Sequence, residues 1–367
     1  MNVKKKSIKD LFIKYLFSKA FVIDTPGFVT GRHIQIVKVG NFSRHVFIPE
    51  KFLANLEDAV IEAKGEEGKK ILYSWGKVGL YRFAKIMGVP TLKNEKDNKS
   101  IKTLFKFLSI MYYNELDTIA DAKNHTVTLK ATNMAVSRFN GKGYFIPQGS
   151  VAGLLSYAYQ DKSIEAIQPH SEGRGDKFTE IIAGPINKLN GEVLSFPNFP
   201  ILEKDQKYDA LNKPIRLSSP SLKEMINKYF FKYEAGRLEI WGERFFPFEI
   251  GIFYYIEKTL IENDLGNLLF EVTKKYFAEF SKNKNITNKN TFFPAFMKAI
   301  GWGDIKVLFG DKKEVICSNY PWTNMYSKNS TFPYFSGAFS GFYGTNFKKE
   351  KVFITDDIKL LLTEAGP

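Results

Sequence analysis

The sequence predicts a mixed fold of helices and antiparallel strands that is present twice in the chain. Residues 7–17 return as residues 221–231, with serine, lysine, acid, lysine and tyrosine at the same places and every apolar position but Ile13, which is aligned with Asn227, kept apolar. Both halves then continue with blocks of the same type in the same order, and each closes on Ala-Gly-Pro, at residues 183–185 and 365–367. Because a duplicated domain makes its own two-fold interface, we expect a pseudo-dimer within one chain.

The domain boundaries follow from the repeat. We expect a first domain over residues 1–185, a linker over residues 186–220 and a second, more diverged copy over residues 221–367. The linker is inferred from its prolines, Pro197, Pro200 and Pro214. A length of 367 residues with 44% hydrophobic residues fits two globular domains with sizeable cores.

The first block of each copy is an amphipathic helix. Apolar residues fall at i, i+3, i+4, i+7 and i+8 from Ile8 and again from Leu222, which places them on one helix face. Ser7 and Ser221 are the expected N-caps. A hairpin follows in each copy. Its expected strands are residues 33–39 and 44–48 in the first copy and residues 237–241 and 244–246 in the second.

Two helices come next in each copy. They are expected over residues 52–64 and 71–86 in the first copy and over residues 252–262 and 268–280 in the second. This alignment sets Trp75, Gly79 and Phe83 opposite Val272, Tyr276 and Phe280. A further apolar helix over residues 101–116 is matched more loosely by residues 292–300.

Each copy then closes with a strand, a glycine-spaced helix and a final strand. The strand at residues 125–131 is aligned with residues 305–309, and the final strands are residues 163–167 and 351–354. The helices carry a glycine pair at i and i+4. The pairs are Gly149 with Gly153, and Gly337 with Gly341. Because glycine has no Cβ, these helix faces are expected to pack closely on the sheet or on a partner helix.

The composition excludes several classes of protein. Cys317 is the only cysteine, which excludes an internal disulfide and a cysteine-based zinc site and favours a cytoplasmic location. The longest apolar stretch, residues 245–256, contains Glu249 and is too short to cross a bilayer. Charged residues from Lys9 to Lys14 interrupt the apolar core that a signal peptide needs, so none is expected.

The order of elements and two local motifs resemble the 4-vinyl reductase domain family. The segment Ile71-Leu72-Tyr73-Ser74-Trp75-Gly76-Lys77-Val78-Gly79 is similar to a helix of that family with a recurring tyrosine and two glycines. Ala152-Gly153-Leu154, residues 164–169 and residues 175–179 are similar to its closing segment. The resemblance covers most of each half.

This resemblance implies the fold class. It is α+β, with two tandem copies of an antiparallel sheet covered by helices, arranged as an intrachain pseudo-dimer. Family members occur as ligand-sensing domains of phenol-responsive regulators and as small archaeal proteins, and the fold is shared with vesicle-tethering subunits. The resemblance therefore implies a buried ligand pocket or a role in assembly.

The zinc site of some family members is not expected here. Those members place an acid and then cysteines along the closing segment. The matching positions hold Gln168, Ser171 and Thr179 in the first half and Thr355 in the second. Zinc needs thiolate, imidazole or carboxylate ligands. We therefore expect neither a metal nor another cofactor.

Aromatic side chains separate the functional hypotheses best. Five of them lie on the elements that enclose the pocket in ligand-sensing relatives, and these are the pocket candidates: Tyr73, Trp75, Phe83, Tyr157 and Tyr159. A filled core is the alternative, and the favoured one, because aromatic side chains are the largest units available for packing.

A formal net charge of +14 leaves a second kind of site open. The candidates for contact with a partner protein or nucleic acid are Lys274, Lys275, Lys282, Trp322 and Tyr326. An ordinary solvated surface is the alternative for the lysines, and no nucleic-acid motif accompanies them. The four histidines, Cys317 and the polar turn at residues 173–176 are interpreted as structural, and no catalytic signature is present.

Three functions follow in order of preference. The first is a non-enzymatic protein that binds a small apolar ligand or serves as an assembly scaffold. The second is a basic protein that binds nucleic acid or a ribonucleoprotein. The third is a tetrapyrrole-related reductase, which rests on the family name, since no nicotinamide or flavin fingerprint supports it.

Overall fold

The computed structural model describes residues 21–32, 42–86, 89, 91–92, 98–112, 115–139, 141, 144–197, 219–234, 237–321, 331–354 and 358–365. Several predicted features lie outside these residues. They are the helix at residues 7–17, the strand at residues 33–39, Thr355, and the loop that holds Trp322 and Tyr326.

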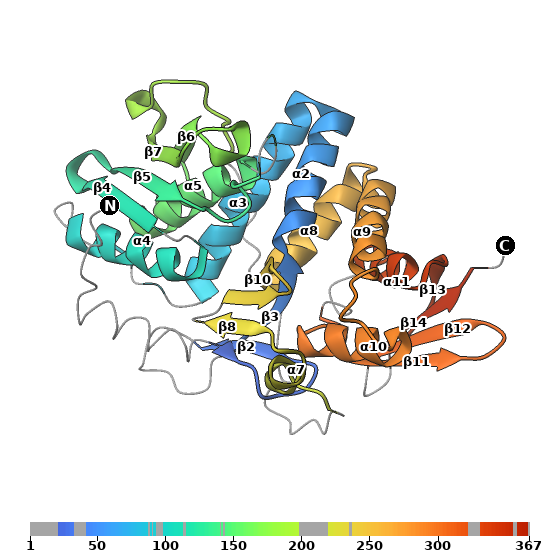
Figure 1. Ribbon diagram of the computed structural model, residues 1–367. Coiled ribbons are helices and arrows are strands. Elements are labelled where there is room, and N and C mark those ends of the chain that lie inside the picture. Colours follow the sequence, from blue (N-terminus) through green and yellow to red (C-terminus); the bar gives the residue numbers. More distant parts are fainter. Residues whose placement is uncertain are drawn as a thin grey trace.

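Each half contains a four-stranded antiparallel sheet, and the two sheets have the same strand order (Figure 1). In the first half the order is β4 (Glu115–Asp121), β5 (Thr126–Thr132), β7 (Thr179–Pro185) and β6 (Ile164–His170). In the second half it is β11 (Asp304–Phe309), β12 (Lys313–Ser318), β14 (Ile358–Glu364) and β13 (Phe347–Ile354). The fold class is therefore α+β with two copies of one helix-covered sheet, as predicted.

The strand order corrects one detail of the sequence alignment. The strand near residues 125–131 is the second of its sheet, and so corresponds to β12, whereas the aligned residues 305–309 form β11, the first strand. The error arose because no strand was predicted directly before residues 125–131, and the predicted helix at residues 101–116 ran into the start of β4. That helix, α4, spans Asn98–Tyr112, and Leu116 already belongs to β4. Only the first three residues of β4, Glu-Leu-Asp, alternate between charged and apolar, so its strand period is short.

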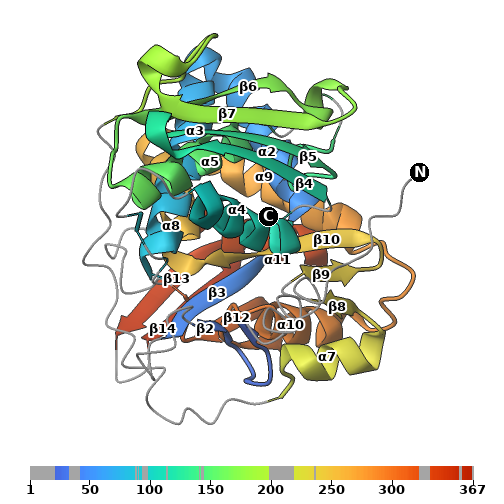
Figure 2. The same cartoon turned by 90° about the vertical axis from the view of Figure 1, so that its left-hand side faces the viewer.

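A third sheet joins the two halves. Its order is β1 (Phe21–Val22), β2 (Val29–Arg32), β3 (Phe42–Pro49), β10 (Glu243–Glu249), β9 (Arg237–Ile240) and β8 (Lys232–Glu234). Figure 2 shows blue β3 beside yellow β10 at its middle. The two strands are antiparallel, with Phe47 opposite Pro247. This pair marks the pseudo-two-fold axis, so a residue of this region corresponds to the residue 200 positions later.

Helices α2 (Glu50–Lys64) and α8 (Ile250–Glu262) leave the ends of β3 and β10. The next helices are α3 (Glu66–Ile86) in the first half and α9 (Gly266–Phe280) in the second. Helices α2 and α8 each pack against a helix of the other half, α2 against α9 and α8 against α3 (Figure 1). Helix α7 (Leu222–Tyr229) begins at Ser221, whose side chain and Glu224 form a capping box, so the predicted N-cap is confirmed. Helix α10 spans Lys289–Ala299.

The glycine-spaced helices are α5 (Phe145–Tyr159) and α11 (Pro333–Tyr343). A Cβ at Gly149 would overlap the carbonyl oxygen of Tyr73, and a Cβ at Gly153 would overlap that of Lys77. The second half repeats this packing between α11 and α9, where Gly337 and Gly341 lie against the carbonyl oxygens of Phe270 and Lys274. The predicted close approach to a partner helix is confirmed. In this packing Tyr73 of the first half is equivalent to Phe270 of the second, and Lys77 is equivalent to Lys274.

Among the described residues, no helix is long and apolar enough to span a bilayer. Cys317 lies fully buried in β12, where desolvation raises the pKa of its thiol, as expected for a core cysteine. The buried side chains of the two halves form one continuous apolar cluster. The sequence-based domain boundaries remain predictions.

Candidate functional site

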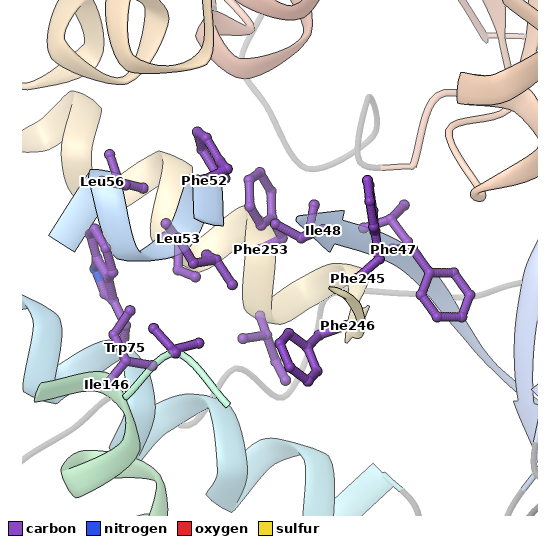
Figure 3. Packing of buried hydrophobic residues seen from close by; sticks show 14 of the residues in the cluster. Phe47, Ile48, Phe52, Leu53, Leu56, Trp75, Ile146, Phe245, Phe246 and Phe253 are labelled. Carbon is purple, nitrogen blue, oxygen red and sulfur yellow. The ribbon is translucent and has the colours of Figure 1, made fainter. Parts of the chain in front are cut away.

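A mostly apolar cavity of about 70 Å³ lies between the two halves. Helices α3 and α5 and the loop after β5 form its first-half wall, and β10 and α8 form its second-half wall. The residues used below are Trp75, Gly79, Phe83, Ile146, Phe246 and Ile252. Figure 3 shows Trp75 beside Ile146, with Phe246 on the second-half side.

The corresponding place in the other half is filled by aromatic rings. The packing of the helices and the two-fold axis identify the equivalent residues. Gly79, Ile146 and Ile252 of the cavity correspond to Tyr276, Tyr334 and Phe52. Phe52 contacts Tyr276 and Tyr334 edge to face, with ring centroids 6.1 and 5.1 Å apart. Both tyrosines are buried. The cavity therefore exists where Gly79, Ile146 and Ile252 replace three aromatic side chains on the same backbone frame.

Trp75, which lines the cavity, carries a buried polar group. Its side chain is 1% exposed, and its indole Nε1 has no hydrogen-bond partner among the described residues. A buried tryptophan N–H usually donates to an acceptor, because an unsatisfied buried donor costs about 1–3 kcal/mol. An oxygen of a bound molecule is one way to satisfy it.

Two ion pairs of Glu50, one within the first half and one between the halves, hold one wall of the cavity. Glu50, at the start of α2, pairs with Arg138 at 2.7 Å and with Arg244 of β10 at 2.6 Å. The same carboxylate accepts a hydrogen bond from the backbone N–H of Val136 at 2.7 Å, and Val136 lines the cavity. Arg244 also donates to the carbonyl oxygen of Asn133 at 3.3 Å. These contacts fix the loop after β5.

A matching contact exists on the other side of the axis. Arg44, the counterpart of Arg244, donates to the carbonyl oxygen of Asn319 at 2.7 Å. Asn319 directly follows β12, as Asn133 follows β5. Each half thus uses an arginine of the shared sheet to hold the loop of the other half.

Glu57 positions the helix that carries Ile146. Its Oε1 accepts hydrogen bonds from the backbone N–H groups of Phe145 at 2.6 Å and Ile146 at 2.9 Å, at the N-terminus of α5. Its counterpart Glu257 accepts from Tyr334 at 3.2 Å. Burial raises the pKa of Glu57 to about 7, against the opposing effect of these hydrogen bonds.

The five predicted pocket residues divide between three places. Trp75 and Phe83 line the cavity. Tyr73 lies instead in a buried polar cluster, where its hydroxyl donates to Glu165 at 2.7 Å and the same carboxylate pairs with Lys77 at 2.8 Å. Burial lowers the pKa of Lys77 in this cluster.

Tyr157 and Tyr159 lie towards the end of α5, outside the cavity lining. The Tyr157 hydroxyl donates to the carbonyl oxygen of Val89 at 3.0 Å. Tyr159 stacks on His125 with ring centroids 4.1 Å apart.

The predicted lysine contacts do not gather into one site. Lys274 donates to the Asn346 side chain at 2.8 Å. Lys275 is exposed, and Lys282 lies at a separate hollow beside Lys51 and Glu279. A role in binding nucleic acid or a partner stays a prediction for these residues.

Sequence reasoning missed the second-half wall, formed by Phe246 and Ile252, and the role of Gly79. The alignment of Gly79 with Tyr276 was the available signal. Within the described part of the chain, no group of three or more histidine, cysteine, aspartate or glutamate side chains is arranged to hold a metal ion.

Comparison with known proteins gives only distant structural likenesses. No protein-family model matches the chain. No curated protein matches it either. Among solved structures, the chain is similar to the phenol-responsive sensory domain of the transcription activator PoxR, solved with phenol. The identity is 13%, the TM-score is 0.33, and the match covers 50% of this chain and 93% of the other.

Proposed function

We propose that the chain binds a small, mostly apolar molecule in the cavity between Trp75 and Ile252. The observation that carries the proposal is the difference between the halves. A duplicated frame is filled by Tyr276 and Tyr334 on one side of the axis and left open on the other. Empty apolar volume in a core is unfavourable unless something occupies it, so a cavity in only one copy favours a binding role.

The chemistry of the lining supports binding over catalysis. The lining residues include no aspartate, glutamate, histidine, lysine, arginine, cysteine or tyrosine. Proton transfer needs such groups, and the one serine of the lining, Ser150, would need one of them as its base to act as a nucleophile. The Ser150 hydroxyl instead donates to the carbonyl oxygen of Ile146 at 2.8 Å. The lining instead offers apolar contact and the Trp75 N–H, which suits a ring or short chain with one hydroxyl or carbonyl oxygen.

The size of the cavity sets the size of the ligand. At about 70 Å³ it is smaller than the engineered cavity of roughly 150 Å³ that holds benzene in another protein. A single ring therefore requires the wall to adjust. Met134 lines the cavity, and methionine is the core side chain that adapts most readily to irregular space.

Calorimetric titration with benzene and phenol, which differ by one hydroxyl, tests the proposal. We expect the intact chain to bind both. Ile252→Phe, which copies the second-half residue Phe52, fills the cavity and should abolish binding of both. Ile226→Phe makes the same change on α7, away from the cavity, and should leave binding unchanged. Equal binding by the Ile252→Phe and Ile226→Phe variants would contradict the proposal.

A second variant separates apolar contact from hydrogen bonding. Trp75→Phe keeps an aromatic ring and removes the N–H donor. The ratio of phenol affinity to benzene affinity should fall by about three- to tenfold, the value of one neutral hydrogen bond, because the smaller ring alters the apolar contact of both ligands alike. An equal loss for both ligands would show that Trp75 acts through packing alone.

A further inference from the structure

A second hollow, separate from the apolar cavity, opens on the second half as a groove of about 580 Å³. It runs between the start of α9, the start of α11 and the start of β13. The residues that matter here are Phe270, Pro333, Asn346, Lys348 and Lys349. No described residue fills it.

The same place in the first half is covered by the chain itself. After β7, the linker returns across α3 and β6. The backbone N–H of Phe196 donates to Glu165 Oε1 at 2.7 Å, and Leu194 is buried at 7% exposure. Ser195 between them is exposed. This alternation is that of an extended segment that places every second side chain on the protein.

Three correspondences show that the two places are equivalent. Phe270 takes the place of Tyr73 in the helix packing, and Pro333 at the start of α11 takes that of Phe145 in α5. Lys77 pairs with Glu165, and its counterpart Lys274 donates to Asn346, just before β13. Asn346 therefore stands where the first half has the carboxylate that receives Phe196.

The strand order adds a further point of equivalence. β6 and β13 are each the last strand of their four-stranded sheet. An edge strand presents backbone groups beside which another segment can lie. In the first half, residues 189–196 run past this edge, whereas the described part of the second half supplies no such segment.

We propose that this groove binds an extended, acidic segment of a partner protein with apolar side chains two residues apart, the chemistry of Glu192, Leu194 and Phe196. The charge of the groove fits such a segment. Lys348 and Lys349 line it and Lys274 contacts it through Asn346, against one acidic residue, Asp264. The Asn346 side-chain oxygen offers the acceptor that Glu165 provides to a backbone N–H in the first half.

Fluorescence anisotropy with a labelled peptide tests the proposal directly. The probe is the chain's own segment, residues 189–197, added to the intact protein at low salt. We expect saturable binding below about 1 mM, as suits a short peptide. A peptide in which the positions of Leu194 and Phe196 both carry aspartate should not bind. Absence of binding by the native peptide, or equal binding by both peptides, would overturn the proposal.

Matched charge reversals locate the site. Lys348→Glu lies in the groove on an exposed side chain, and Lys312→Glu makes the same change in the β11–β12 turn. We expect the first to weaken peptide binding about three- to fivefold, within the range of exposed charge pairs, and the second to leave it unchanged. Thermal unfolding of both variants checks that the fold is intact. Equal affinity of the two variants would place the peptide elsewhere and contradict the proposal.

Discussion

The cavity beside Trp75 and the aromatic cluster around Tyr334 occupy corresponding places in the two halves, and one is hollow while the other is filled. The backbone frame is the same, since both pairs of helices approach through glycines at i and i+4. The difference lies in side-chain size, with Gly79 opposite Tyr276 and Ile146 opposite Tyr334. Duplication therefore fixed the position of an interior site, and a few substitutions decided whether that site is open.

A second contrast concerns polar groups at equivalent positions. In the first half, Lys77 and Glu165 are both fully buried and paired. In the second half, Lys274 is only half-buried, and its partner is the neutral side chain of Asn346. The first half thus has a closed polar cluster beside an open apolar cavity, and the second half has the reverse.

The largest effect is expected at the buried ion pair between Lys77 and Glu165. Lys77→Met leaves the Glu165 carboxylate buried without its cation and should lower the free energy of unfolding by about 3–5 kcal/mol. Lys274→Met removes a partly solvated hydrogen bond and should cost less than about 1 kcal/mol. Urea unfolding of the two variants measures both. Equal costs would show that the two clusters are energetically alike.

The next effect depends on pH. Burial raises the pKa of Glu57 from 4.5 to about 7, so the folded state holds this proton more tightly than the unfolded state. The contribution of Glu57 to the free energy of unfolding is complete below about pH 4.5. It falls by about 3 kcal/mol as the pH rises through 7. Glu57→Gln should reduce the loss of stability between pH 5 and pH 8.

Glu62→Gln is the matched control for that experiment, because Glu62 is exposed on the same helix. Denaturant unfolding at both pH values should give the intact chain and the Glu62→Gln variant the same pH dependence. A Glu57→Gln variant with an unchanged slope would show that Glu57 titrates normally in the folded protein.

A third change sharpens the comparison of the two interiors. Tyr334→Ile copies Ile146 and should open a cavity in the second half at a cost of about 2–3 kcal/mol. The cost stays moderate because the Tyr334 hydroxyl is buried without a partner among the described residues, and isoleucine removes that group. Calorimetry should then detect a second benzene site. A destabilised variant with one site would mean that the neighbouring rings collapse into the space.

The smallest expected effect concerns the segment in which the duplication is most visible. Ser221→Ala removes the capping box of α7 and should lower the free energy of unfolding by about 1 kcal/mol. Ser7 is the aligned serine and lies outside the described residues. Thermal unfolding of Ser7→Ala compares the two, and a cost near zero there would show that the sequence repeat is not matched by an equal stabilising role.

Much of the frame could be predicted from sequence because it depends on local pattern. The i, i+4 glycines indicated close helix packing, and the aligned blocks indicated a duplicated fold. The pairing of β3 with β10 was not visible, since these strands are about 200 residues apart and any edge strand has several possible partners. The alignment of residues 125–131 failed because a strand pattern does not identify its place in a hairpin.

The candidate site could likewise be predicted from the sequence only in part. Trp75 and Phe83 were identified through the helix that carries them, but Tyr73 on that helix lies in a different environment. Two residues along a helix turn the side chain by about 200°, so one helix presents Tyr73 and Trp75 to different neighbours. The second-half wall could not be inferred, because it depends on the joint between the halves.

The shared sheet determines what one half would be on its own. Without β10, β3 would be left with an unpaired row of backbone N–H and C=O groups and, beyond it, an uncovered apolar surface around Phe47 and Phe52. Such an edge recruits another strand, and the strand of matching shape is the same one from a second copy. We therefore expect a single half to self-associate, and two halves in one chain to make that association independent of protein concentration.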